Sequence, residues 1–181
     1  RPRVEGSGAQ FVGYSRARDF DDAKIDEEFP GRARLRGLAQ LKYDMKHVFI
    51  DAAPDQAADI REIMRSFPAD LLMYDAAMVG ALLVHEQNGP PSLAVGVLPM
   101  VMSSVDTAPF GLGLQPSTNL FRRVRNRLLN WFVQNVAFRD VQAHWQAMRA
   151  RLQMGPTGWW LNHVTRSTFY LQPSVRGFEY A

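Results

Sequence analysis

The chain has 181 residues, of which 46% are hydrophobic and 22% are charged, a composition typical of a soluble globular domain. It contains no cysteine, so disulfide bonds and thiolate chemistry are excluded, and a cytoplasmic location is expected. The formal net charge is only +3, but residues 121–151 contain seven arginines and a single acidic residue, Asp140. No apolar run reaches the ~20 residues that a membrane-spanning helix needs.

The first third of the chain predicts helices joined by polar segments. Residues 1–8 resemble the tail of a helix, residues 10–14 a short strand, and the charged residues 15–33 a long loop. Apolar side chains then recur at helical spacing over residues 35–49, which predicts a helix. A further helix is expected over residues 55–66.

The strongest local pattern lies in residues 67–98. Two short apolar runs, residues 69–74 and 93–98, flank an almost wholly apolar stretch, residues 76–86. They predict a strand, a buried helix and a second strand, and two buried strands joined by one helix form a parallel βαβ unit. Ligands of open α/β sheets bind beyond the carboxyl ends of the strands, so Asp75 and the segment after the second strand are expected at the functional edge.

The second half of the chain predicts a loop, further helices and one more strand. The expected elements are a loop at 99–117, helices at 120–135 and 138–152, a short helical segment at 159–164, a strand at 168–171 and an extended tail at 173–181. This alternation predicts an α/β fold, a doubly wound parallel sheet with helices on both faces. We expect a single domain over residues 1–181, in which the sheet lacks its first strands.

Asp75 is the first candidate for chemistry. An aspartate between a strand and a helix is a good N-cap, and it can also orient and charge-stabilise a histidine that acts as general base. The histidines show no zinc-ligand spacing and are expected to be ordinary helix residues; they are His47, His85, His144 and His163. The sequence contains no nucleophile-elbow, phosphate-loop or dinucleotide-binding motif.

Two further stretches have an unusual composition. The loop of residues 99–115 is apolar without a regular period, which indicates either the lining of an apolar ligand site or burial against another domain. The arginines of residues 122–127 lie opposite an apolar helix stripe and are expected to face solvent, with an anionic membrane surface as the alternative. Nucleic acid is not expected as a partner, because no aromatic residues interleave with these arginines.

Several of these stretches resemble family-1 glycosyltransferases with the GT-B fold, in particular the macrolide type of natural-product enzymes. Residues 67–96, FPADLLMYDAAMVGALLVHEQNGPPSLAVG, resemble the family pattern P-D-hydrophobic-D…A…G-[IV]-P. Residues 4–12, 108–113 and 171–180 resemble other stretches of the family's N-terminal domain in the same order. The resemblance covers nearly the whole chain.

The resemblance implies a Rossmann-like acceptor-binding domain, the N-terminal half of an enzyme whose C-terminal domain binds a UDP- or dTDP-sugar. In such enzymes a histidine deprotonates the acceptor hydroxyl for a metal-independent, inverting displacement, and Asp75 matches the aspartate that holds this histidine. The histidine would lie before Arg1. The acceptor, a small and largely apolar molecule, is expected to contact Met78, Pro99, Met102, Ser103, Phe110 and Leu112.

The same resemblance sets the expected partners. They are the acceptor and the donor-binding domain, with a homo-oligomer left open, and no cofactor or metal is expected in this segment. Because the chain begins with Arg-Pro-Arg and not with Met, we expect a segment of a longer protein that is inactive alone. We expect it to fold only when a missing strand beside residues 69–74 is supplied by upstream residues, by a partner chain or by a rearranged sheet. The alternative hypothesis is a non-catalytic α/β docking module that recruits a separate catalytic subunit.

Overall fold

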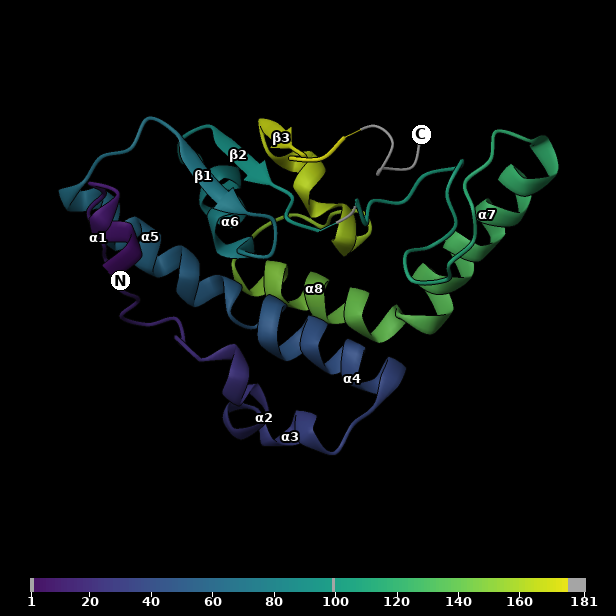
Figure 1. The fold of residues 1–181 in the computed structure, drawn as a ribbon, viewed down its shortest axis with the longest axis horizontal. Coiled ribbons are helices and arrows are strands. Elements are labelled where there is room, and N and C mark those ends of the chain that lie inside the picture. The colour runs from purple at the N-terminus through teal and green to yellow at the C-terminus, as the bar shows by residue number, and fades with distance from the viewer. Residues whose placement is uncertain (1, 99, 176–181) are drawn as a thin grey trace.

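A three-stranded parallel sheet packed on helices lies at the centre of the computed structural model, which describes residues 2–98 and 100–175 (Figure 1). The strands, in spatial order, are β1 (Leu72–Asp75), β2 (Ser92–Val95) and β3 (Phe169–Leu171). The register places Tyr74 beside Ala94 and Ala94 beside Tyr170. The prediction of an α/β fold with a parallel sheet is therefore confirmed.

Helices make up most of the first half of the chain. In order they are α1 (Pro2–Gly6), η1 (Asp22–Lys24), α2 (Ile25–Glu28), α3 (Pro30–Ala33), α4 (Gly37–Tyr43), η2 (Asp44–Ile50) and α5 (Ala53–Ser66). Helix α4 passes without a break into η2, which winds as a π-helix. The predicted helices at 35–49 and 55–66 are confirmed. The loop predicted at 15–33 is wrong in part, because this stretch contains three short helical segments. Arg32 of α3 forms ion pairs with Asp26 of α2 and with Asp44, the first residue of η2.

Residues 10–14 form no strand, contrary to the prediction. The backbone that follows them is held by a side chain, because the N–H groups of Ser15, Arg16 and Ala17 donate to the carboxylate of Asp59 on α5 at 2.9–3.1 Å. Asp59 is only 2% exposed. Burial opposes its charge, but the hydrogen bonds from Ser15, Ala17 and Arg16 outweigh burial and hold the pKa of Asp59 at about 2. The segment therefore docks on α5 and needs no strand partner.

The strand–helix–strand unit forms as predicted. Strand β1 leads into α6 (Val79–Glu86) and then into β2, and the side chains of residues 79–84 are all buried. Gly80 permits α6 to cross α5 closely, because a Cβ at this position would lie 2.8 Å from both Ala53 O and Ala57 N of α5. Asn88 takes a positive φ of 66° just beyond the end of α6, in the conformation typical of a helix C-terminus.

The second half of the chain contains α7 (Leu120–Phe132), η3 (Val133–Ala137), α8 (Arg139–Arg151) and η4 (Trp160–Arg166), all close to the predicted bounds. Helix α8 packs against η2 and α6, with Trp145 fully buried in the same core cluster as Ile50 and Leu83. Inside this packing, Glu86 of α6 forms ion pairs with Arg149 of α8 and with Arg166 of η4.

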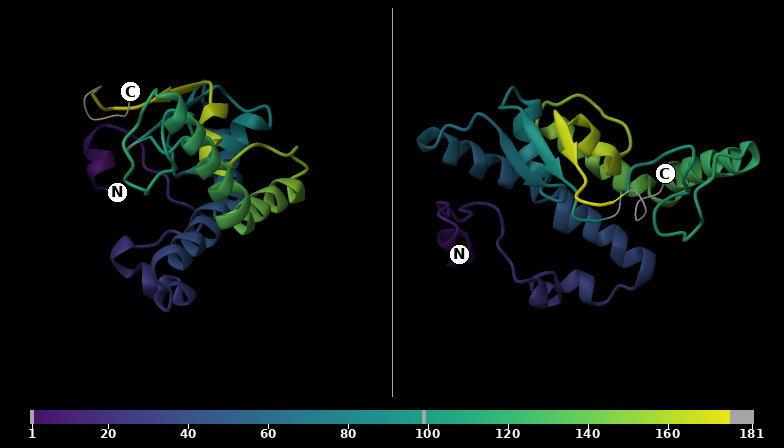
Figure 2. Two further views of the ribbon diagram at one scale, coloured as in Figure 1. Left: turned by 90° about the vertical axis from the view of Figure 1, so that its right-hand side faces the viewer. Right: turned by 45° about the horizontal axis from the view of Figure 1, so that its top comes forward.

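The helices gather on one face of the sheet (Figure 2). Tyr74 and Ala94 are buried on that face with side chains of α6 and η4. On the opposite face Met73, Phe169 and Leu171 are exposed. Helices were expected on both faces of the sheet, but the described residues, 2–98 and 100–175, place helices on one face only. Among the described strands β1 pairs with β2 alone and its other edge is open, so the expectation that a further strand must be supplied beside β1 is not met in this structure.

Helix α7 projects from the body of the molecule and presents its apolar stripe to solvent (Figure 1). Phe121 is 84% exposed, and the other exposed members of the stripe are Leu120, Val124, Leu128, Trp131, Phe132 and Val136. The packed side of the helix is polar instead, with Asn126 fully buried. Arg122, Arg123 and Arg127 are exposed, as predicted, whereas Arg125 is partly buried and donates to Asn126 Oδ1. Every described helix is too short or too polar to cross a bilayer.

Candidate functional site

A cavity of about 270 Å³ opens beyond the carboxyl ends of β1 and β2. Its lining is mostly apolar and comes from η2, the β1–α6 turn, the loop of residues 100–119, the junction of η3 with α8, and the start of η4. Among the described residues of this lining, Asp75 supplies the one carboxylate and His163 the one imidazole. An apolar cavity with a few polar groups at this edge of a parallel sheet is the usual form of a small-molecule site.

Asp75 is the last residue of β1 and is exposed to solvent. Its Oδ1 accepts a hydrogen bond of 2.8 Å from the N–H of Ala77, and its main-chain oxygen accepts one of 2.7 Å from Met78. Because α6 begins at Val79 with Met78 before it, Asp75 stabilises the turn that precedes the helix and is not the N-cap. Among the described residues no histidine bonds to Asp75, so any histidine partner must come from elsewhere.

His163 is the histidine that the structure brings to the cavity. Its Nε2 lies 2.8 Å from the main-chain oxygen of Ala76, the residue after Asp75, and its Nδ1 lies 2.8 Å from Trp160 O. The ring also stacks on the Trp160 indole at 5.6 Å with an interplanar angle of 9°. Burial lowers the pKa of His163, although both carbonyl contacts favour the charged form. Sequence reasoning assigned His163 to an ordinary helix, and its place beside the β1–α6 turn follows only from tertiary packing.

Three of the loop residues predicted to bind the acceptor line the cavity: Met102, Ser103 and Phe110. Ser103 is fixed from both sides, because its N–H donates to Asn162 Oδ1 at 3.0 Å and its Oγ accepts from Gln134 Nε2 at 2.9 Å. This part of the apolar loop therefore faces the cavity.

The remaining predicted contact residues lie elsewhere. Leu112 is exposed and does not belong to the cavity lining. Met78 is half-buried, and its Sδ accepts a hydrogen bond from the Tyr14 hydroxyl at 3.7 Å outside the lining. Pro99 and residues 176–181 of the predicted tail are outside the described residues.

The loop of residues 100–119 is tied to α7 and η3 by side-chain amides. Asn130 Nδ2 donates to the main-chain oxygens of Ser104 and Thr107 at 3.1 and 3.2 Å, and Asn126 Nδ2 donates to Val105 O at 3.3 Å. These bonds explain why the polar side of α7 is the packed side. No signal in the sequence indicated this reversal, because the apolar stripe alone predicts burial.

Comparison with known proteins places the chain among glycosyltransferases. Curated proteins similar to it include 4'-demethylrebeccamycin synthase of Lentzea aerocolonigenes, 35% identical over 182 residues, and UDP-glycosyltransferase 2 of Phaeomoniella chlamydospora, 30% identical over 193 residues. Both matches cover 99% of this chain but 43% and 42% of the two relatives, so the chain spans less than half of their length. It matches no protein-family model and has no significant match among solved structures. These similarities support a family-1-like glycosyltransferase N-terminal domain as the counterpart of this chain.

Proposed function

We propose that the chain is the acceptor-binding domain of an inverting, nucleotide-sugar-dependent glycosyltransferase whose donor-binding domain follows it. The observation that supports this most is the 270 Å³ apolar cavity at the carboxyl edge of the sheet, in which Asp75 is the one carboxylate that the described residues supply. A cavity of this size and lining suits a small, largely apolar acceptor with a hydroxyl group at the Asp75 end. The absence of cysteine fits a cytoplasmic enzyme.

In the proposed reaction Asp75 acts through a histidine supplied outside this chain. Asp75 Oδ1 is used by the turn, whereas Oδ2 makes no hydrogen bond to a described residue and is available to accept from an imidazole. The carboxylate orients that imidazole and stabilises the imidazolium that forms when it takes the acceptor proton. The acceptor oxygen then attacks the anomeric carbon, the nucleoside diphosphate leaves with the bonding electrons, and the configuration at that carbon inverts.

Met102 and Phe110 are proposed to contact the apolar part of the acceptor, because both line the cavity. Trp160 also belongs to this lining, but its indole N–H is buried and has no hydrogen-bond partner among the described residues.

Acceptor binding is testable in the chain itself, because Trp159 and Trp160 line the cavity and report on it by fluorescence. Titration with polycyclic aromatic alcohols should quench this fluorescence in a saturable way. Met102→Trp, which fills the cavity, should weaken binding at least tenfold, whereas the matched control Leu112→Ala, in the same loop but outside the lining, should not. Equal effects of the two variants would show that the cavity is not the acceptor site.

Catalysis is tested in the full-length protein that contains this chain together with a donor domain. Asp75→Asn should lower kcat by orders of magnitude while changing acceptor KM little, because it removes charge and leaves the shape of the site intact. Full activity of this variant would exclude the proposed role of Asp75. Absence of any sugar transfer by the unsubstituted protein with UDP- and dTDP-sugars would favour the docking-module alternative, for which the exposed stripe of α7 is the supporting observation.

A further inference from the structure

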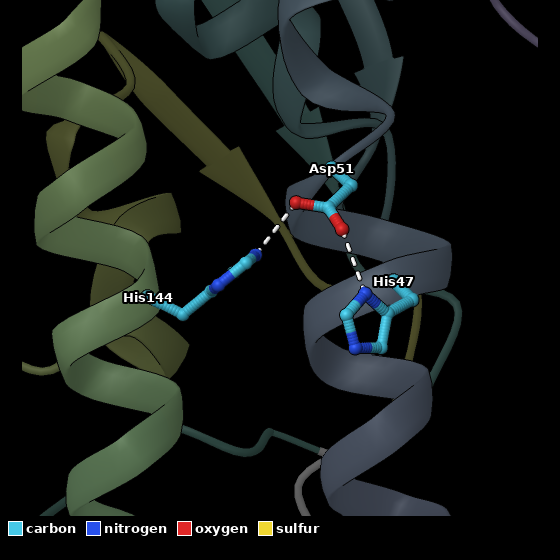
Figure 3. Close-up of side chains that lie close together, drawn as sticks. All are labelled: His47, Asp51 and His144. Atoms are coloured by element: carbon cyan, nitrogen blue, oxygen red, sulfur yellow. Dashed lines mark hydrogen bonds and ion pairs between the residues drawn. The ribbon is translucent and has the colours of Figure 1, made fainter.

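A second group of polar side chains lies outside the cavity, where η2 packs against α8. It consists of His47 of η2, Asp51 directly after η2, and His144 of α8 (Figure 3). None of the three lines the cavity, and the proposed glycosyl transfer uses none of them. Figure 3 shows both imidazoles directed at the same carboxylate from two different helices.

The geometry of this cluster brings three metal-ligand atoms together. Asp51 Oδ2 lies 2.8 Å from His47 Nδ1, and Asp51 Oδ1 lies 2.6 Å from His144 Nε2. The two rings meet edge to face at 5.7 Å, and one ligand atom from each residue lies within 4.8 Å of the other two. The side chains are 39%, 38% and 26% exposed, so an ion can reach them from solvent.

The backbone beneath the cluster is rigid, which favours a preformed site. Ile50, next to Asp51, and Trp145, next to His144, are both fully buried in the main core cluster. One helical turn away, Lys46 Nζ lies 3.0 Å from Asp140 Oδ2 and adds a second link between η2 and α8. The three ligands are therefore held in place by packing that does not depend on an ion.

We infer that His47, Asp51 and His144 bind one divalent transition-metal ion, such as Zn²⁺. Two imidazole nitrogens and one carboxylate oxygen form a common ligand set for such ions, with the fourth position left to water. Mg²⁺ and Ca²⁺ prefer oxygen ligands and are not expected here. Metal bonds of about 2.0–2.2 Å require the nitrogen–oxygen distances between these ligands to widen to roughly 3.3 Å, a shift of about half an ångström.

The net charge around the cluster is too small to attract cations by itself. Near the cluster, Lys42 and Lys46 both pair with Asp140, so these three side chains carry a net charge of +1 and Asp51 offsets it. Binding must then come from the directed nitrogen and oxygen ligands, and hard cations of equal charge should not compete. A bound ion joins η2 to α8 and stabilises the fold on the side of η2 away from the acceptor cavity.

The test uses untagged chain, freed of metal with a chelator and then titrated with Zn²⁺ by calorimetry and with Co²⁺ by visible absorption. One ion per chain is expected, with a rise in melting temperature that the chelator reverses and that excess Mg²⁺ does not reproduce. His144→Gln and His47→Gln should each weaken binding at least tenfold. The control His85→Gln, which changes a histidine on α6 outside the cluster, should bind like the parent chain.

Binding that survives both cluster substitutions, or a stoichiometry near zero, would overturn the inference. Should a variant fail to fold by circular dichroism, X-ray absorption at the zinc edge of the unsubstituted chain decides the matter. Two imidazole ligands and one carboxylate in the first coordination shell support the site, and any other ligand set refutes it. None of these measurements depends on sugar transfer, so their outcome is independent of the proposed function.

Discussion

Replacement of Asp59 by asparagine tests how the N-terminal segment is held. The two carboxylate oxygens accept from the N–H groups of Ser15, Arg16 and Ala17 and from the Ser15 hydroxyl at 2.6–3.1 Å. An asparagine can turn its oxygen toward the three N–H groups and its NH₂ group toward the Ser15 oxygen, so the bonds survive but lose the charge. Hydrogen bonds to charged groups contribute roughly 1.5–3 kcal/mol and neutral ones roughly 0.5–1.5 kcal/mol. For three bonds the expected loss in the free energy of unfolding is about 3 kcal/mol.

The assay is urea unfolding at pH 7, followed by tryptophan fluorescence. The matched control is Asp55→Asn, an exposed aspartate on the same helix, which should cost less than about 1 kcal/mol. Acid titration gives a second measurement. Because the pKa of Asp59 falls from 3.8 to about 2 on folding, its stabilisation is complete above pH 3.8 and is lost as the pH falls through about 2. Asp59→Asn should remove this part of the acid dependence.

Two results would refute this reasoning. One is an Asp59→Asn variant within 0.5 kcal/mol of the parent, roughly the range expected of a substitution on an open surface. The other is an unchanged acid dependence between pH 4 and pH 2, which would assign the titration to other carboxylates. Either result would mean that residues 15–17 are not docked on α5 through this carboxylate.

Three further substitutions test the packing around α6 and the cavity. Gly80→Ala should destabilise the chain by about 1–3 kcal/mol, because the added Cβ would lie 2.8 Å from backbone atoms of α5. A melting temperature equal to that of the parent would contradict the close crossing of α6 and α5. Glu86→Gln should lower the free energy of unfolding by about 3–5 kcal/mol, because it leaves the buried guanidinium of Arg149 without its counter-charge. The exposed control Glu62→Gln should change the free energy of unfolding by less than about 1 kcal/mol. Because the pKa of His163 is lower in the folded chain than in the unfolded chain, the unfolded chain binds the proton at a higher pH, and stability should fall as the pH drops below about 6.5. A His163→Asn variant whose stability has the same pH dependence as the parent would contradict this role of His163.

The βαβ unit was predictable because its signals are local. The apolar run of α6 has no polar face, so the sequence could place it only inside the molecule, between two strands. The strand at residues 10–14 was not predictable in the same way. Its β-branched and aromatic residues are common in strands, but a strand needs a partner edge, and a carboxylate 42–44 residues later in the chain binds the adjoining backbone instead.

The candidate site was predicted in part for similar reasons. Asp75 ends β1, Met102, Ser103 and Phe110 follow β2 in sequence, and parallel strands bring their carboxyl ends to one edge. His163 reaches the same place from 87 residues beyond Ala76, and His144 reaches Asp51 from 93 residues away. The spacing of His47 and Asp51 by four residues was visible in the sequence. The third ligand depends on how η2 packs against α8, and that packing is a tertiary property.

The hydrogen bonds from α7 to the loop of residues 100–119 affect which substitutions this protein can accept. The side-chain amides of Asn126 and Asn130 donate to main-chain oxygens of this loop, and every residue type carries such an oxygen. Side chains of the loop can therefore be exchanged while its path past the cavity stays the same. Met102 and Phe110, which line the cavity, can therefore change in size and polarity one at a time while the backbone of the loop stays the same. A natural lineage, or a mutant library confined to these positions, can alter the shape of the cavity while the helix that holds the loop remains constant.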